Sequence, residues 1–236
     1  MKKLFFLTSF LMVLIIAPMV MADQVQVYRE PGYFSGTGGE FTLKIVNNNA
    51  APDLNSNWAL YSLKTSDIGT NNPSFQSFCV EWDEHVSVPG GPYNVVINNA
   101  AVAGGVGGPH PDPLSVGAAY LYYQFSQGIL TGYNYTSGPN REASALALQN
   151  AIWWLEDEIT LTIPTNNNFI NLLGFISDPK ADNKGLYPVA ILNLYEGTTF
   201  KQDQLVTVSA PEPATMLLLG SGLIGLAGYA RRRFKK

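Results

Sequence analysis

The sequence predicts an α+β domain in which an antiparallel β-sandwich or barrel lobe carries a helical insertion. Short alternating segments fill the first half, a 3.6-residue period takes over near residue 115, and strand-like segments return near residue 187. The chain has 236 residues, of which 46% are hydrophobic and only 14% charged. Such a balance provides a core and excludes a coiled coil or a charge-rich disordered protein.

Strands are predicted wherever short apolar or alternating runs are bounded by turn residues. Turn signals such as Pro31-Gly32 and Asn71-Asn72-Pro73 separate the early runs. The predicted strands are Gln24–Tyr28, Phe41–Val46, Trp58–Lys64, Gln76–Trp82, Tyr93–Ile97, Tyr187–Tyr195 and Gln204–Val208.

Three helices are predicted between these two groups of strands: Ser115–Ile129, Arg141–Glu158 and a short one at Asn168–Ser177. Ser137 or Asn140 is expected to cap the second helix, with Pro139 near its first turn. The acidic run at 156–158 is expected to be the solvated end of that helix.

The amino terminus has the pattern of a secretory signal peptide. Lys2 and Lys3 precede an apolar run, and small residues follow, so cleavage is predicted between Ala22 and Asp23. The predicted division is therefore a signal peptide at 1–22, a domain at 23–210 and a carboxyl-terminal segment at 211–236. An uncleaved anchor helix is the alternative interpretation of residues 1–22.

The carboxyl terminus has three parts. Pro211-Glu212-Pro213 comes first, an uncharged run at 214–230 predicts a membrane helix, and Arg231-Arg232-Arg233 follows. The basic cluster is expected to stay cytoplasmic, which places the domain on the other side of the membrane.

This tail resembles the PEP-CTERM sorting signal of Gram-negative bacteria. The resemblance implies an exported protein that is anchored transiently in the inner membrane and cut by an exosortase-type peptidase, after signal peptidase has acted. Its destination would be the cell surface, the outer membrane or the extracellular matrix. A plain single-pass anchor is the alternative.

The predicted domain is acidic. Residues 23–210 hold 7 of the 14 basic and 17 of the 18 acidic residues, a net charge of −10. Nucleic acid is therefore excluded as a partner, because binding phosphates needs a basic surface.

Cys79 is the single cysteine, which excludes an internal disulfide and a zinc site built from several thiolates. Alternation in a strand places Phe78, Val80 and Trp82 on the core face and Ser77, Cys79 and Glu81 on the other. A buried Cys that serves as a small hydrophobic residue is the simplest interpretation.

Gln149 lies within an apolar helix and shares a helix face with Trp153. A buried primary amide needs hydrogen-bond partners or costs about 1–3 kcal/mol. Taken alone, Gln149 is best interpreted as an amide that binds loop backbone.

Together, the Phe78-Cys79-Val80-Glu81 segment and the Leu148-Gln149 segment that ends at Trp153 resemble the two motifs of bacterial surface thioester domains. The resemblance implies an internal thioester between Cys79 and Gln149, with Phe78, Glu81 and Trp153 as supporting motif residues. Such a domain couples once to an amine-bearing surface ligand or matrix component, as an adhesin does, so it is no turnover enzyme and needs no cofactor.

Alternatives stay open at this point. The protein could be a non-covalent structural or exopolysaccharide-binding protein of a biofilm matrix, or a Cys-dependent hydrolase with His85 as base. Asp83, His85, His110 and Asp112 show no repeated ligand spacing, so no metal site is predicted.

Overall fold

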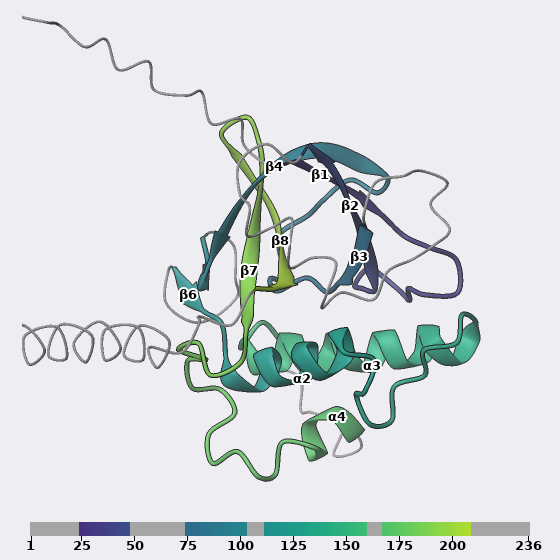
Figure 1. Cartoon of the computed structure of the whole chain (residues 1–236), viewed down its shortest axis with the longest axis vertical. Helices are drawn as coiled ribbons and strands as arrows, with labels where there is room; N and C mark the ends of the chain where they lie inside the picture. Colours follow the sequence, from purple (N-terminus) through teal and green to yellow (C-terminus); the bar gives the residue numbers. More distant parts are fainter. Residues whose placement is uncertain (1–23, 48–73, 103–110, 160–166, 209–236) are drawn as a thin grey trace, which may run out of the picture.

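Figure 1 shows the computed structural model, which describes residues 24–47, 74–102, 111–159 and 167–208. Several predictions concern residues outside these ranges: the signal peptide, the strand Trp58–Lys64, His110 and the membrane helix at 214–230. Among the described residues, no helix has the length and apolar character needed to cross a membrane.

Six strands form one antiparallel sheet that curls strongly (Figure 1). Its order is β3-β2-β1-β4-β7-β8. The strands are β1 (Gln24–Tyr28), β2 (Phe41–Asn47), β3 (Ser74–Ser77), β4 (Gly90–Asn98), β7 (Val189–Glu196) and β8 (Thr199–Thr207). β5 (Ala100–Ala101) and β6 (Asp112–Pro113) pair separately. The predicted antiparallel lobe is thereby confirmed as a single curled sheet.

The curl brings the two edges of the sheet together just beyond β3. The backbone N–H of Leu205 donates to the carbonyl of Phe78 at 3.0 Å, and that of Val80 donates to the carbonyl of Asp203 at 3.0 Å. Cys79 and Gln204 form an isolated antiparallel bridge between these two bonds. The segment Phe78–Val80 is therefore the seam of the sheet, and Cys79 lies at its centre.

The helices lie together along one end of the curled sheet, in the chain between β6 and β7 (Figure 1). They are α2 (Val116–Ser126), α3 (Pro139–Leu155) and α4 (Asn168–Asn171). Ser115 caps α2 by accepting from the N–H of Ala118. The predicted side-chain cap of α3 is wrong: Gly138 is the N-cap and makes no side-chain hydrogen bond there. Its φ of 133° favours glycine.

The core has two parts, and the seam contributes to both. Phe78 and Val80 pack among the residues of α2 and α3, whereas Cys79 belongs to the cluster inside the sheet. Neighbouring side chains therefore point to opposite sides, as alternation predicts. Trp82 departs from this prediction, since its side chain is 45% exposed. The regular strand ends at Ser77, and the chain bends after the seam.

The acidic run after α3 is also not the solvated end that the sequence suggested. Glu156 and Glu158 are buried, and Asp157 alone is exposed. Glu156 accepts from the backbone N–H and the hydroxyl of Ser115. Glu158 accepts from the backbone N–H of Trp82 at 2.9 Å. The helix end turns inward because it supplies acceptors to backbone N–H groups of two other segments.

Candidate functional site

The seam and helix α3 bring Cys79 and Gln149 into contact. The Cys79 sulfur lies 3.3 Å from Gln149 Oε1, although the two residues are 70 positions apart in the chain. Both side chains are completely buried. Gln149 points out of α3 toward the seam, one helical turn before Trp153, so the packing of the helix against the sheet sets the distance between sulfur and amide.

Three further hydrogen bonds fix the orientation of the Gln149 amide. The backbone N–H groups of Gly39 and Cys79 both donate to Oε1, at 2.9 and 3.2 Å. Nε2 donates to the carbonyl of Cys79 at 2.8 Å. These bonds satisfy the buried amide. Two N–H groups on one carbonyl oxygen also form the arrangement of an oxyanion hole.

The Gly38-Gly39 pair permits this close approach, and the sequence analysis did not identify it. A Cβ on Gly38 would lie 2.4 Å from Gln149 Cγ, and one on Gly39 would lie 2.7 Å from a ring carbon of Phe78. Neither distance is compatible with a side chain. The consecutive glycines before β2 were the available signal, because glycine often marks close backbone approach.

A buried ion pair next to this loop connects it to the start of α3. Arg141 donates to both carboxylate oxygens of Glu40, at 2.9 and 2.5 Å, and the Tyr133 hydroxyl donates to the same carboxylate at 2.5 Å. Burial raises the pKa of Glu40, and the bonds to Arg141 oppose that rise. Because Glu40 follows Gly39, this pair positions the Gly39 N–H against Gln149.

Burial favours the neutral form of the Cys79 thiol. Burial raises the pKa of Cys79 far above its ordinary value, and the indole of Trp153 and the charge of Arg29 only partly oppose the rise. The buried Nε1 of Trp153 has no conventional hydrogen-bond partner among the described residues. Any reaction of Cys79 with Gln149 must therefore start from the S–H form and move its proton as the bond forms.

The supporting motif residues have different surroundings. Phe78 packs edge-on against Phe125 at 5.0 Å, and Trp153 packs edge-on against Trp82 at 4.6 Å. Glu81 belongs instead to a group of acids with Glu158 and Asp112. The structure therefore places Phe78 and Trp153 in the walls of the thiol–amide site and Glu81 beside it.

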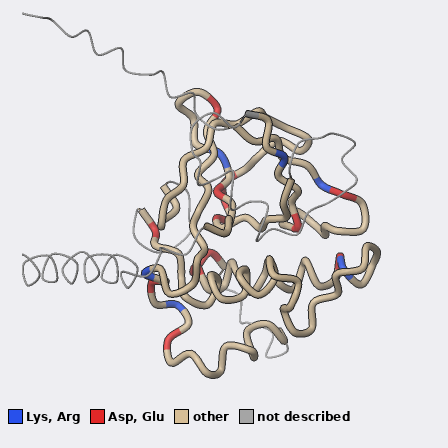
Figure 2. Tube along the Cα trace, viewed as in Figure 1, with Lys and Arg blue, Asp and Glu red and all other residues tan. Residues whose placement is uncertain are grey.

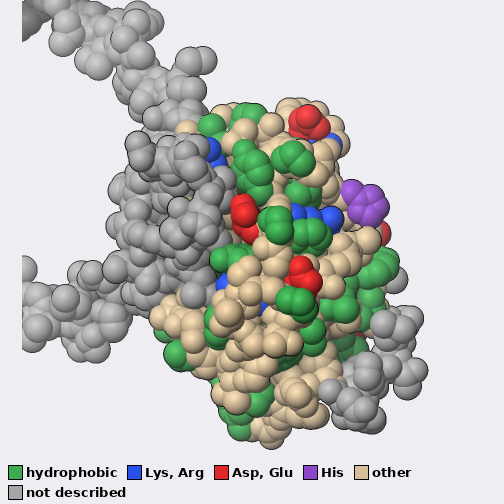
Figure 3. All heavy atoms as spheres, turned by 90° about the vertical axis from the view of Figure 1, so that its right-hand side faces the viewer, with side chains coloured by type: hydrophobic (Ala, Val, Ile, Leu, Met, Phe, Trp, Pro, Cys, Tyr) green, Lys and Arg blue, Asp and Glu red, His purple; other side chains and the backbone are tan. Residues whose placement is uncertain are grey.

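A pocket of about 140 Å³ adjoins the site. Its lining residues are Thr37, Trp82, His85, Trp153 and Gln202. Gln149 does not line this pocket, whereas Trp153, one helical turn further along α3, and Thr37, next to the Gly38-Gly39 loop, do. His85 is exposed here, and within the described chain no hydrogen bond joins it to Cys79, so a Cys/His dyad is not formed. Hydrophobic side chains are spread over the face shown in Figure 3, among isolated charged ones.

Residues 209–233 match the model of the PEP-CTERM protein-sorting motif. The chain is an exosortase-sorted, exported protein. The motif implies processing by an exosortase-type peptidase and transient membrane anchoring in a Gram-negative bacterium. The predicted signal residues from Pro211-Glu212-Pro213 to Arg233 all fall in the matched range, which lies outside the described residues. No curated protein and no solved structure matches the chain.

Proposed function

We propose that the exported domain forms an internal thioester between Cys79 and Gln149 and then couples covalently to an amine-bearing partner. One observation carries the proposal: the buried sulfur lies 3.3 Å from the amide oxygen of Gln149, and two backbone N–H groups donate to that same oxygen. An amide bound only for structural reasons needs the N–H groups but no sulfur beside its carbonyl.

Bond formation is an intramolecular acyl transfer. The sulfur attacks Gln149 Cδ, and the Gly39 and Cys79 N–H groups stabilise the negative charge that develops on Oε1. Nε2 leaves as ammonia and takes the thiol proton, so a thioester and ammonia replace a thiol and an amide. Fixed neighbours react with effective molarities of about 10⁵ M or more in good geometries. The rigid packing of the seam against α3 provides such a neighbour.

Coupling to the partner is the second acyl transfer. A neutral amine attacks the thioester carbonyl in the same oxyanion hole, an amide forms between the partner and Gln149, and Cys79 leaves with the proton that the amine loses. The domain is used once, because nothing in this sequence of steps restores the starting amide. The amine would enter by the pocket beside Trp82 and Trp153, and it reaches the thioester only if Trp153 moves aside, because Gln149 does not line that pocket. Indole rings attract ammonium groups.

The charge of the molecule suits such a partner. The predicted domain is strongly acidic, and its few basic residues are scattered singly along the trace (Figure 2). Amine-bearing molecules carry positive charge at neutral pH, so the net negative charge of the domain favours their approach. An exported protein meets such groups on surface ligands and matrix components.

Intact mass spectrometry of the purified protein tests the bond. The expected mass is lower than the sequence mass by one ammonia, with no titratable thiol in the denatured protein. Methylamine should then add one molecule at Gln149 and release the Cys79 thiol. Cys79→Ser should show the full mass of its sequence and no adduct.

A matched pair of glycine variants separates the chemistry from simple packing. Gly39→Ala displaces the N–H donor at Gln149 and should slow thioester formation, whereas Gly174→Ala meets only ordinary contacts and should react like the wild type. A wild-type protein with full mass and a free thiol would overturn the proposal. The non-covalent matrix role would then account for the exported domain.

A further inference from the structure

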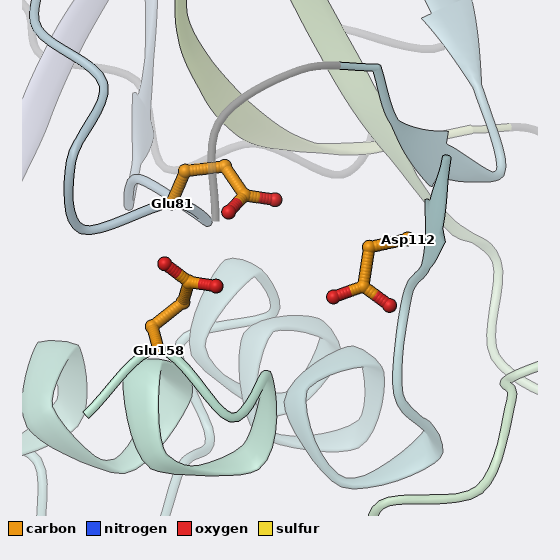
Figure 4. Close-up of side chains that lie close together, drawn as sticks. All are labelled: Glu81, Asp112 and Glu158. Atoms are coloured by element: carbon orange, nitrogen blue, oxygen red, sulfur yellow. The ribbon is translucent and has the colours of Figure 1, made fainter. Parts of the chain in front are cut away.

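Three carboxylates meet beside the thiol–amide site, and they come from three different segments. Glu81 follows the seam, Asp112 is in β6, and Glu158 follows α3. One oxygen from each lies within 4.8 Å of the others. In Figure 4 the carboxylates of Glu81 and Glu158 face each other, and Asp112 turns toward the same space from the opposite side.

Glu81 is the residue that makes this group more than a surface cluster. Its side chain is only 1% exposed, and Oε2 is buried with no hydrogen-bond partner among the residues that the structure describes. A buried, unsatisfied carboxylate oxygen aimed at other carboxylates calls for a positive group.

We propose that Glu81, Asp112 and Glu158 form a calcium-binding site. Calcium binds carboxylate oxygens at about 2.3–2.6 Å, so ligands on opposite sides of one ion are up to about 5 Å apart, as the spacing here allows. A cavity of about 340 Å³ opens beside Asp112, the one of the three acids that is partly exposed. Oxygen-only ligands suit calcium better than zinc or copper.

The ion would tie the seam to the end of α3. Glu81 is two residues after Cys79. Glu158 accepts a hydrogen bond from the backbone N–H of Trp82, the residue that follows Glu81. A calcium ion between Glu81 and Glu158 therefore fixes the sulfur-bearing segment to the helix that carries Gln149. Calcium binding does not depend on the thioester, so either proposal can be wrong while the other holds.

Calcium titration of the full-length protein in detergent, after removal of metal with EDTA, tests the site. We expect binding by calorimetry with a dissociation constant of about 10⁻³ M or tighter, the range of extracellular calcium modules. We also expect a rise in the thermal midpoint with CaCl2 that is larger than with equal MgCl2.

The variants Glu81→Gln and Asp112→Asn should each weaken calcium affinity at least tenfold. Glu84→Gln is the matched control, because it removes a neighbouring acid that is not a ligand, and calcium should still stabilise it. Asp112 is partly exposed, so its variant remains informative if Glu81→Gln misfolds.

Two results would overturn the proposal. The first is a wild type on which calcium has no effect, which would mean that Glu81 and Glu158 share a proton instead. The second is an equal response of the ligand variants and Glu84→Gln, which would reduce the effect to general attraction by acidic residues.

Discussion

At the amino-terminal end of α3 the buried Glu40 is matched by Arg141, whereas at the carboxyl-terminal end the charges around Glu81 are those of other acids. Both glutamates follow closely on a backbone N–H that binds Gln149, at Gly39 and at Cys79. The site is therefore held from two sides, once by the Glu40–Arg141 ion pair and once by a group of acids. The comparison shows that burial alone does not tell how a carboxylate is stabilised.

The largest loss of stability should come from breaking the ion pair between Glu40 and Arg141. Arg141→Met leaves Glu40 buried without its guanidinium and should lower the free energy of unfolding by about 3–5 kcal/mol. The control is Lys180→Met, which removes an exposed pair with Asp157 and should cost about 1 kcal/mol or less. Urea denaturation measures both, and equal losses would contradict the distinction.

Replacing Glu by Gln should lower stability at Glu40 but not at Glu81. Glu40→Gln leaves Arg141 without its charge partner and should cost about 3 kcal/mol. In calcium-free buffer, Glu81→Gln replaces an oxygen that lacks a donor by an amide that donates to its acidic neighbours, so stability should stay equal or rise. Chemical denaturation of the two variants at the same pH gives the comparison, and a large loss for Glu81→Gln would show that its charge is already compensated.

The acidic end should also give the protein a distinct pH dependence. Burial raises the pKa of Asp203 to about 7, with opposition from the amide of Asn193. The folded protein therefore holds a proton that the unfolded chain has lost, and this contribution is present at low pH and disappears as the pH rises to about 7. Relative to Asp203→Asn, the wild type should lose about 2 kcal/mol between pH 5 and pH 7. Parallel stability curves for the two proteins would contradict the assignment.

The smallest change in stability is expected at Glu156, a buried acid after α3 that accepts hydrogen bonds from Ser115. Ser115→Ala removes the hydroxyl that caps α2 and donates to Glu156, and it should cost about 1 kcal/mol in thermal denaturation. Ser87→Ala, in an exposed loop, should change stability by less than about 0.5 kcal/mol. A similar cost for both would mean that the Ser115 contacts contribute nothing measurable.

The sequence predicted the parts of the fold that depend on local pattern. Strand alternation located β1, β2 and β4, and helical spacing located α2 and α3. The two motifs also pointed to Cys79 and Gln149, which the structure brings into contact, while their reaction stays a prediction. These signals are readable because each is contained within about ten residues.

The features that the sequence analysis missed depend on distant contacts. Gly39 and Gln149 are 110 residues apart, and Glu40 and Arg141 are 101 apart. Nothing in the local pattern around Glu40 indicates which basic residue it meets. The burial of Glu158 escaped prediction for the same reason, because its partner is the backbone of Trp82 in a remote segment.

The position of Cys79 at the seam has a consequence for the timing of the proposed acyl transfer. The sulfur and the amide approach each other only when the two sheet edges have met and α3 has docked, because they lie 70 residues apart in the chain. A polypeptide threaded through a membrane in unfolded form carries the two groups separately. Such a chain would arrive on the far side of the membrane unreacted, and folding there would act as the trigger.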